Sequence, residues 1–120
     1  MTEKTATDLI EEAKKRIREV TPSEAMQMHE ADPGIVYLDV REPMEWNLGH
    51  IPGAVLIPCG NLESRIEATI PREKKIIIYC ARGNRSALAA DTMQQMGYAD
   101  VASMSQGIIG WVDAGGEIEG

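Results

Sequence analysis

Residues 76–86 read Ile-Ile-Ile-Tyr-Cys-Ala-Arg-Gly-Asn-Arg-Ser, an apolar run followed by a cysteine and a loop that carries a glycine and two arginines. A helical pattern begins near Asn84, so we expect a buried strand that ends at Cys80 and a helix a few residues later. Backbone N–H groups of such a loop and the positive end of the helix dipole stabilise a thiolate. The two arginines attract an anion. This stretch therefore predicts a reactive cysteine and an anionic substrate.

Apolar runs on both sides of this loop alternate with helical patterns. Continuous apolar runs predict strands at 35–40, 54–57, 75–79 and 101–104. Helices are predicted at 61–69 and 84–96, and from a capping box at Thr21 to a turn at 32–34. This alternation indicates an α/β fold, with a mostly parallel sheet that is flanked by helices on both faces. Ligands of such sheets bind beyond the carboxyl ends of the strands, where Cys80 falls.

The N-terminal residues form a separate amphipathic pattern. Apolar residues recur at helical spacing from about Thr7 to Val20, with charged residues between them. We therefore divide the chain into a helical extension, residues 1–19, and a domain, residues 20–120. This helix is expected to cover the domain's own core, while docking of a partner or dimerisation remains an alternative, so the protein is a monomer or a homodimer.

Charge and cysteine content narrow the class of protein. The net charge of −7 argues against a nucleic-acid surface, which needs a basic face. The polar N-terminus and the lack of a long apolar run predict no membrane contact and a cytoplasmic location. Cys59 and Cys80 are the two cysteines, too few for a secreted disulfide framework.

Three motifs in this order resemble those of the rhodanese (sulfurtransferase) family. The loop at Cys80 is similar to that family's active-site loop, usually Cys-x-x-Gly-x-Arg-Ser. Residues 38–54 contain Leu-Asp-Val-Arg-Glu-Pro-Met-Glu-Trp and Gly-His-Ile-Pro-Gly-Ala, and residues 107–111 read Gly-Ile-Ile-Gly-Trp. The resemblance runs from about Val20 to Ile118 and implies a single rhodanese-like domain with a sheet of about five strands. Gln106 departs from the pattern, because a glycine is usual there.

The resemblance implies a reaction for Cys80. Its thiolate attacks the outer sulfur of a small anionic donor such as thiosulfate, which forms a persulfide and releases sulfite. A thiol, cyanide or a protein thiol then accepts the sulfur. The N–H groups of the loop would hold both the thiolate and the persulfide, and the loop consists of Ala81, Arg82, Gly83, Asn84, Arg85 and Ser86. No cofactor or metal is expected.

The polar residues of the loop have different expected roles. Arg82 is expected to contact substrate, with a solvated surface arginine as the alternative. Arg85 is expected to brace the loop by pairing with an acid, and Asp39 and Arg41 are the expected bracing partners because Asp39 ends the neighbouring strand. Ser86 is expected to cap the following helix, although it could instead donate to the sulfur.

Other candidate residues are assigned structural roles. In the Gly-His-Ile-Pro-Gly motif, the resemblance points to turn-stabilising hydrogen bonds for His50. Cys59 is expected to be a half-buried filler, with a resolving thiol for a Cys80 persulfide as the alternative. Trp46 and Trp111 are expected to pack beneath the loops.

Two other functions remain open. Related phosphatases and arsenate reductases also use a loop cysteine, but a phosphatase loop has five residues between cysteine and arginine. Here four residues separate Cys80 from Arg85, which disfavours oxyanion hydrolysis. The second alternative is a non-catalytic carrier that holds persulfide sulfur on Cys80 for a partner protein.

Overall fold

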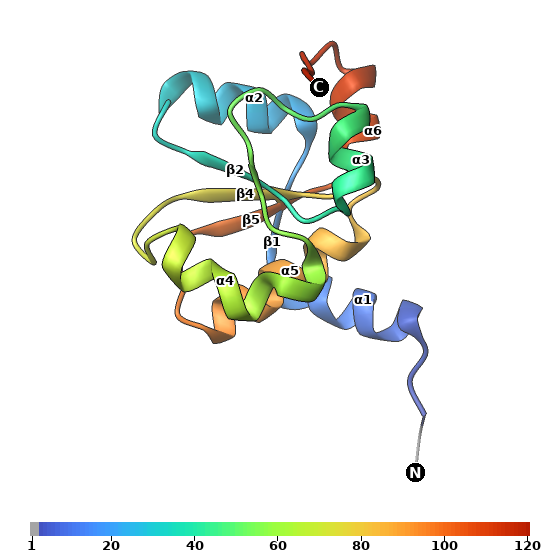
Figure 1. The fold of residues 1–120 in the computed structure, drawn as a ribbon. Coiled ribbons are helices and arrows are strands. Elements are labelled where there is room, and N and C mark those ends of the chain that lie inside the picture. The colour runs from blue at the N-terminus through green and yellow to red at the C-terminus, as the bar shows by residue number, and fades with distance from the viewer. Residues whose placement is uncertain (1–2) are drawn as a thin grey trace.

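A computed structural model describes residues 3–120. In this part of the chain one parallel sheet is formed by β1 (Arg18–Val20), β2 (Val36–Asp39), β3 (Val55–Leu56), β4 (Ile76–Tyr79) and β5 (Val101–Met104). The strand order is β1-β5-β4-β2-β3, and every neighbouring pair is parallel. The predicted α/β fold with five strands is therefore confirmed (Figure 1).

Helices cover both faces of the sheet. The helices of the described residues are α1 (Ala6–Arg16), α2 (Pro22–Ala31), α3 (Pro43–Leu48), α4 (Leu62–Thr69), α5 (Asn84–Gln95) and α6 (Gly107–Asp113), with a 3₁₀ turn at Cys59–Asn61. Helices α4 and α5 contribute to the core on one face, and α2 and α6 contribute to the core on the other (Figure 1). Each strand of the centre is thus buried from both sides, as its continuous apolar run predicts.

The N-terminal segment differs from the predicted single helix. Helix α1 ends at Arg16, and the next residues form the edge strand β1, with Arg18 opposite Ala102 of β5. The spacing of Ile17 and Val20 suits a helical face, but pairing with β5 satisfies the backbone of these residues in an extended form. The expected boundary at residues 19 and 20 therefore falls inside a strand of the sheet.

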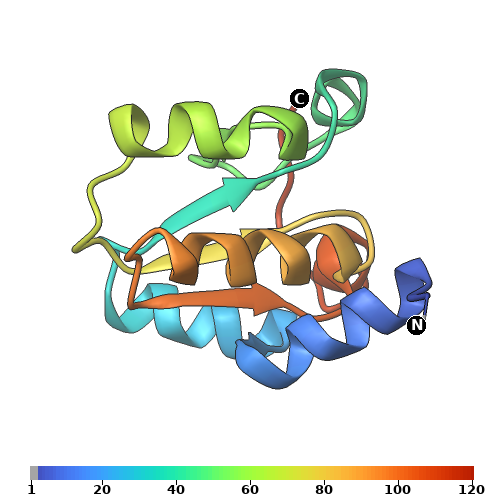
Figure 2. The same ribbon diagram turned by 90° about the horizontal axis from the view of Figure 1, so that it is seen from below.

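Helix α1 lies beside α5 on the outside of the fold (Figure 2). Arg16 donates to both carboxylate oxygens of Asp91 at 2.9 and 2.8 Å, and Gln94 Nε2 donates to the Arg16 carbonyl at 2.9 Å. Ala13 is fully buried at this contact. Helix α1 thus covers α5 rather than the sheet itself.

No helix within residues 3–120 has the length and apolar character needed to cross a bilayer.

Candidate active site

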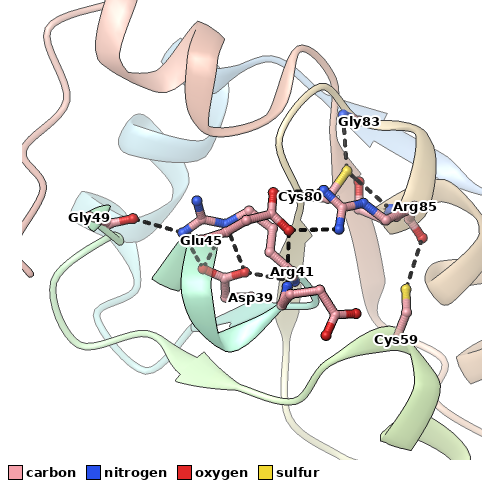
Figure 3. Close-up of polar contacts among 10 residues, drawn as sticks. Asp39, Arg41, Glu45, Gly49, Cys59, Cys80, Gly83 and Arg85 are labelled. Atoms are coloured by element: carbon pink, nitrogen blue, oxygen red, sulfur yellow. Dashed lines mark hydrogen bonds and ion pairs between the residues drawn. The ribbon is translucent and has the colours of Figure 1, made fainter. Parts of the chain in front are cut away.

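Cys80 follows directly after β4, the central strand, at the edge where the parallel strands end. Its Sγ accepts hydrogen bonds from the backbone N–H of Gly83 at 3.1 Å and from that of Ser86 at 3.4 Å. The residue is 2% exposed. Figure 3 shows the Gly83 nitrogen directed at this sulfur. Of the N–H groups predicted to hold the sulfur, those of Gly83 and Ser86 donate to it.

Two glycines allow the loop to close around the sulfur. Gly83 has φ +95°, and a Cβ there would lie 3.2 Å from the carbonyl oxygen of Met104. At Gly107 a Cβ would collide with the carbonyl oxygens of Cys80 and Ala81. These close approaches hold the loop against the start of α6, where Ile108 N donates to the Cys80 carbonyl at 2.9 Å.

Ser86 does not cap helix α5, so that prediction is wrong. The helix begins at Asn84 with Gly83 as its N-cap, which places Ser86 inside the first turn. Its buried Oγ lies 3.5 Å from Cys80 Sγ and 2.8 Å from Ser103 Oγ. The hydroxyl can donate to a thiolate while the Ser103 hydroxyl donates to it, so the alternative role is the one that the geometry favours.

Arg85 pairs with Glu45, not with Asp39 as predicted. Its guanidinium donates to the two carboxylate oxygens of Glu45 at 2.9 and 3.0 Å (Figure 3). Hydrogen bonds from Arg85 lower the pKa of Glu45 from 4.5 to about 2. Glu45 lies in the first turn of α3 and also accepts from the backbone N–H of Glu42. Arg85 thus pairs with an acid, and that acid is Glu45 rather than Asp39.

Asp39 pairs with Arg41 instead. Both residues are buried, with 2.7 Å between Arg41 Nη2 and Asp39 Oδ2. The same nitrogen donates to the Gly49 carbonyl at 2.7 Å. Arg41 thus ties the end of β2 to the end of α3, which carries Glu45. Asp39 and Arg41 support the loop through α3 rather than through direct contact with Arg85.

Arg82 is exposed and lines a hollow of about 280 Å³ with Gln106, Ile109, Gly110 and Asp113. Among residues 3–120, the ion pairs do not include Arg82. Its charge is therefore available to a ligand that approaches the loop. Contact with substrate stays a prediction for this residue.

His50 stabilises its turn, as predicted. Its Nδ1 lies 3.0 Å from the Trp46 carbonyl oxygen, and its ring stacks on the Trp46 indole with 3.5 Å between centroids. Its backbone exchanges two hydrogen bonds of 2.8 Å with Glu119. Trp111 is buried beneath the C-terminal segment, and its Nε1 donates to the Glu117 carbonyl at 2.8 Å.

Cys59 is half-buried and packs against the same core cluster as Cys80. Its thiol donates to the Arg85 carbonyl oxygen at 3.9 Å (Figure 3). Burial raises the pKa of this thiol. The geometry agrees with a filler, because a thiol that donates to a carbonyl is held in its neutral form.

Gln106 stands in the left-handed region with φ 65°, which glycine adopts at lower cost. It is the N-cap of α6, so the turn that the family usually builds with glycine is kept here with a glutamine. The departure at Gln106 therefore leaves the start of α6 next to Cys80.

Residues 21–114 match the family model of the Rhodanese-like domain. The chain belongs to the rhodanese-like family. It is 34% identical over 94 residues to a sulfurtransferase of Allochromatium vinosum, covering 78% of this chain and 87% of that protein. It is also 33% identical over 93 residues, 77% of this chain, to the probable adenylyltransferase/sulfurtransferase MoeZ of Mycobacterium tuberculosis, of which it spans 24%. A 36% identity over 95 residues links it to YrkF, a putative sulfur carrier protein of Bacillus subtilis, covering 79% of this chain and 51% of that one.

Two solved structures share this fold. A thiosulfate sulfurtransferase from Pseudomonas aeruginosa superposes with a TM-score of 0.81 and 28% identity, over 95% of this rhodanese-like chain and 22% of that one. A protein of unknown function from Rhodopseudomonas palustris, described as a possible tyrosine phosphatase, gives a TM-score of 0.89 and 36% identity over 99% and 97% of the two chains.

Proposed function

We propose that this rhodanese-like domain is a sulfurtransferase that moves sulfane sulfur from a donor such as thiosulfate to a thiol or to cyanide. The observation that carries the proposal is the convergence of polar hydrogens on Cys80 Sγ. Gly83 and Ser86 direct N–H groups at this atom, and the Ser86 hydroxyl lies beside it. These groups stabilise negative charge on sulfur without a general base.

The first half of the reaction loads Cys80. The thiolate attacks the outer sulfur of thiosulfate, a new S–S bond forms, and the old bond breaks with its electron pair leaving on sulfite. The persulfide is itself an anion, so the same N–H groups can hold it. Arg82 would attract the donor, because its side chain is exposed in the loop that follows Cys80 and has no ion-pair partner among the described residues.

The second half unloads the persulfide. An acceptor thiolate or cyanide attacks its outer sulfur, and the electron pair of the broken S–S bond returns to Cys80. Since each half restores the charge that the loop stabilises, one set of donors serves both halves. The enzyme therefore alternates between two covalent forms and needs no cofactor for the transfer.

Phosphatase chemistry is a weaker candidate for this loop. An oxyanion at Cys80 would need the guanidinium of Arg85, which is engaged on both arms by Glu45. Only four residues lie between Cys80 and Arg85, which leaves a narrower loop. A carrier role is the other candidate, because the chain is similar to a putative sulfur carrier protein.

Steady-state kinetics test the proposal. With thiosulfate and cyanide both varied, double displacement predicts parallel lines in double-reciprocal plots. Fast loading of Cys80 with slow turnover for every small acceptor would favour the carrier. Hydrolysis of p-nitrophenyl phosphate without sulfur transfer would contradict the proposal.

A further inference from the structure

An open apolar groove lies between α3 and α6, beside the loop of Cys80. It has a volume of about 320 Å³ and is lined by Arg41, Leu48, Gly49, Ile108, Ile109, Val112, Asp113 and Ile118. Seven large apolar side chains are exposed within residues 3–120, and four of them line this groove. Figure 2 shows α3 (teal-green) and α6 (red) lying apart, with the C-terminal segment running from α6 towards α3. Exposed apolar surface that gathers in one place marks an interaction site.

The groove is joined to the reactive loop. Ile108 N donates to the Cys80 carbonyl at 2.9 Å, and Ile109 N donates to the Ala81 carbonyl at 3.3 Å. Ile109 and Asp113 also line the hollow that contains Arg82. A molecule seated in the groove therefore lies next to the hollow that Arg82 lines.

A small inorganic donor is not expected to bind in this groove. Thiosulfate is a compact dianion, and an apolar lining disfavours a charged group that it cannot solvate. The arginine in the groove, Arg41, is already neutralised by Asp39. The groove therefore suits the reactant of the second half-reaction, the acceptor.

Charge selects among the possible acceptors. Asp113 lies in the groove, and Glu119, with its side chain 58% exposed, follows the groove residue Ile118. With a net charge of −7, two copies of the chain repel each other across such a rim. Small thiols that carry carboxylates meet the same repulsion and bring no large apolar group. The rim favours an apolar occupant that carries basic residues.

We propose that the groove, which we call the α3–α6 groove, docks a sulfur-accepting polypeptide whose cysteine is flanked by apolar and basic residues. The proposal rests on the persulfide chemistry proposed above. The acceptor thiolate attacks the outer sulfur of the Cys80 persulfide, a new S–S bond forms, and the bond to Cys80 Sγ breaks with its electron pair left on the Cys80 thiolate. The outer sulfur lies about 2.05 Å beyond Sγ, which brings the reacting atom closer to a docked partner.

Three acetylated and amidated peptides test this specificity on protein whose Cys80 is already loaded with sulfur. They are Lys-Leu-Cys-Leu-Lys, Lys-Ser-Cys-Ser-Lys and Glu-Leu-Cys-Leu-Glu. We expect the first to unload Cys80 about tenfold faster than the second at subsaturating peptide, since burying two leucine side chains readily gives this factor. The acidic peptide is expected to be several-fold slower than the first, with the difference reduced by added salt.

The variants Leu48→Gln and Val112→Gln locate the effect. Each is expected to remove most of the preference for the leucine peptide, while loading by thiosulfate and unloading by 2-mercaptoethanol stay unchanged. Leu9→Gln on α1 is the matched control, because Leu9 is 48% exposed and Val112 is 47% exposed. Its preference should equal that of the wild type.

Four outcomes decide the matter. Loss of the preference in both groove variants and its retention in Leu9→Gln support the proposal. Equal rates for the two lysine peptides, or a preference that survives both groove variants, overturn it. A dimer that dissociates on Leu48→Gln assigns the groove to a second copy and also overturns it. If Cys80 takes up no sulfur from thiosulfate, the result contradicts the proposed function instead. This uptake is measured before any peptide is added.

Discussion

Cys80 and Cys59 both contact the backbone of residues 83–86, but the backbone groups that they contact differ in polarity. Cys80 Sγ accepts from the N–H groups of Gly83 and Ser86, whereas the Cys59 thiol donates to the Arg85 carbonyl. Both follow strands of the same sheet, and both pack on the same core cluster. The polarity of the groups that face each sulfur therefore separates the two thiols. A surrounding of N–H groups favours a thiolate, and a carbonyl favours a neutral thiol.

The largest effect is expected from exchanging each cysteine for serine. Cys80→Ser should abolish sulfur transfer from thiosulfate to cyanide, because the nucleophile is gone. Cys59→Ser should keep turnover within about twofold of the wild type, since the oxygen can still donate to the Arg85 carbonyl. Thiocyanate formation measures both. A loss of turnover in Cys59→Ser would show that Cys59 acts as a resolving thiol, and the comparison would then fail.

Arg82 is an exposed residue of the loop that surrounds Cys80. We expect Arg82→Ala to raise the KM for thiosulfate about tenfold, because one charge-assisted contact to the anion is lost. The free energy of unfolding should stay unchanged, since the side chain is exposed. Arg72→Ala is the control for the KM, because Arg72 precedes β4 and so lies at the end of this strand opposite to Cys80. An unchanged KM in Arg82→Ala would make Arg82 a solvated surface residue.

The pH dependence of alkylation tests whether the Cys59 thiol is neutral at pH 7. In Cys80→Ser, Cys59 is the single cysteine, and burial raises the pKa of its thiol above the ordinary value of 9.0. Because the thiolate is the reactive form, the rate with iodoacetamide should be small at pH 7 and should rise with a midpoint above pH 9. A midpoint below pH 9 would show that Cys59 is also activated.

Ser86→Ala tests the hydroxyl that distinguishes the surroundings of Cys80. Removing it takes one polar hydrogen from the thiolate and leaves Ser103 Oγ without its partner. We expect kcat/KM for thiosulfate to fall about three- to tenfold, because a typical hydrogen bond contributes about 1 kcal/mol net and this contact is long, at 3.5 Å. The release of sulfite from thiosulfate measures this change.

The serine at 103 provides the control for that change. Ser103→Ala keeps the hydroxyl next to Cys80 and should lower stability while kcat/KM for thiosulfate stays unchanged. Equal kcat/KM values for Ser86→Ala and the wild type would remove Ser86 from the set of groups that stabilise the thiolate.

The smallest effect is expected for Glu45→Gln, which weakens the pairing of this residue with Arg85 in the loop of Cys80. The pair with Arg85 is partly exposed, so its loss should cost about 1 kcal/mol of the free energy of unfolding, measured in urea at neutral pH. The pKa of Glu45 is lowered to about 2 in the fold, so the pair contributes in full above its ordinary value of 4.5. As the pH falls from 4.5 towards 2, the difference between wild type and variant should narrow. A difference that stays constant over this range would contradict the assigned pair.

The alternation of apolar runs with helical patterns was sufficient to predict the parallel sheet, and the apolar run that ends at Cys80 was sufficient to predict the place of this residue. The partner of Arg85 was not predictable in the same way. Asp39 ends the neighbouring strand, but Arg41 follows two residues later and neutralises it locally. Glu45 reaches Arg85 because Pro43 starts a helix that turns back over the loop, a feature of tertiary structure.

Two further differences have local causes. The edge strand β1 has three residues, and its apolar positions continue the spacing of the preceding helix, so periodicity alone could not separate them. Ser86 resembles a helix cap in sequence, but Gly83 with its positive φ takes the cap and moves Ser86 next to the sulfur. The Cys-x-x-Gly-x-x-Ser spacing was the signal that could have indicated this role.

The mass of the intact protein after incubation with thiosulfate shows whether Cys80 receives the sulfur. We expect a gain of one sulfur atom that cyanide removes, that peptide mapping locates on Cys80 and that Cys59→Ser retains. The matching experiment on Cys80→Ser should show no gain. A persulfide located on Cys59, or no adduct on Cys80 with thiosulfate or any other sulfane donor, would contradict it.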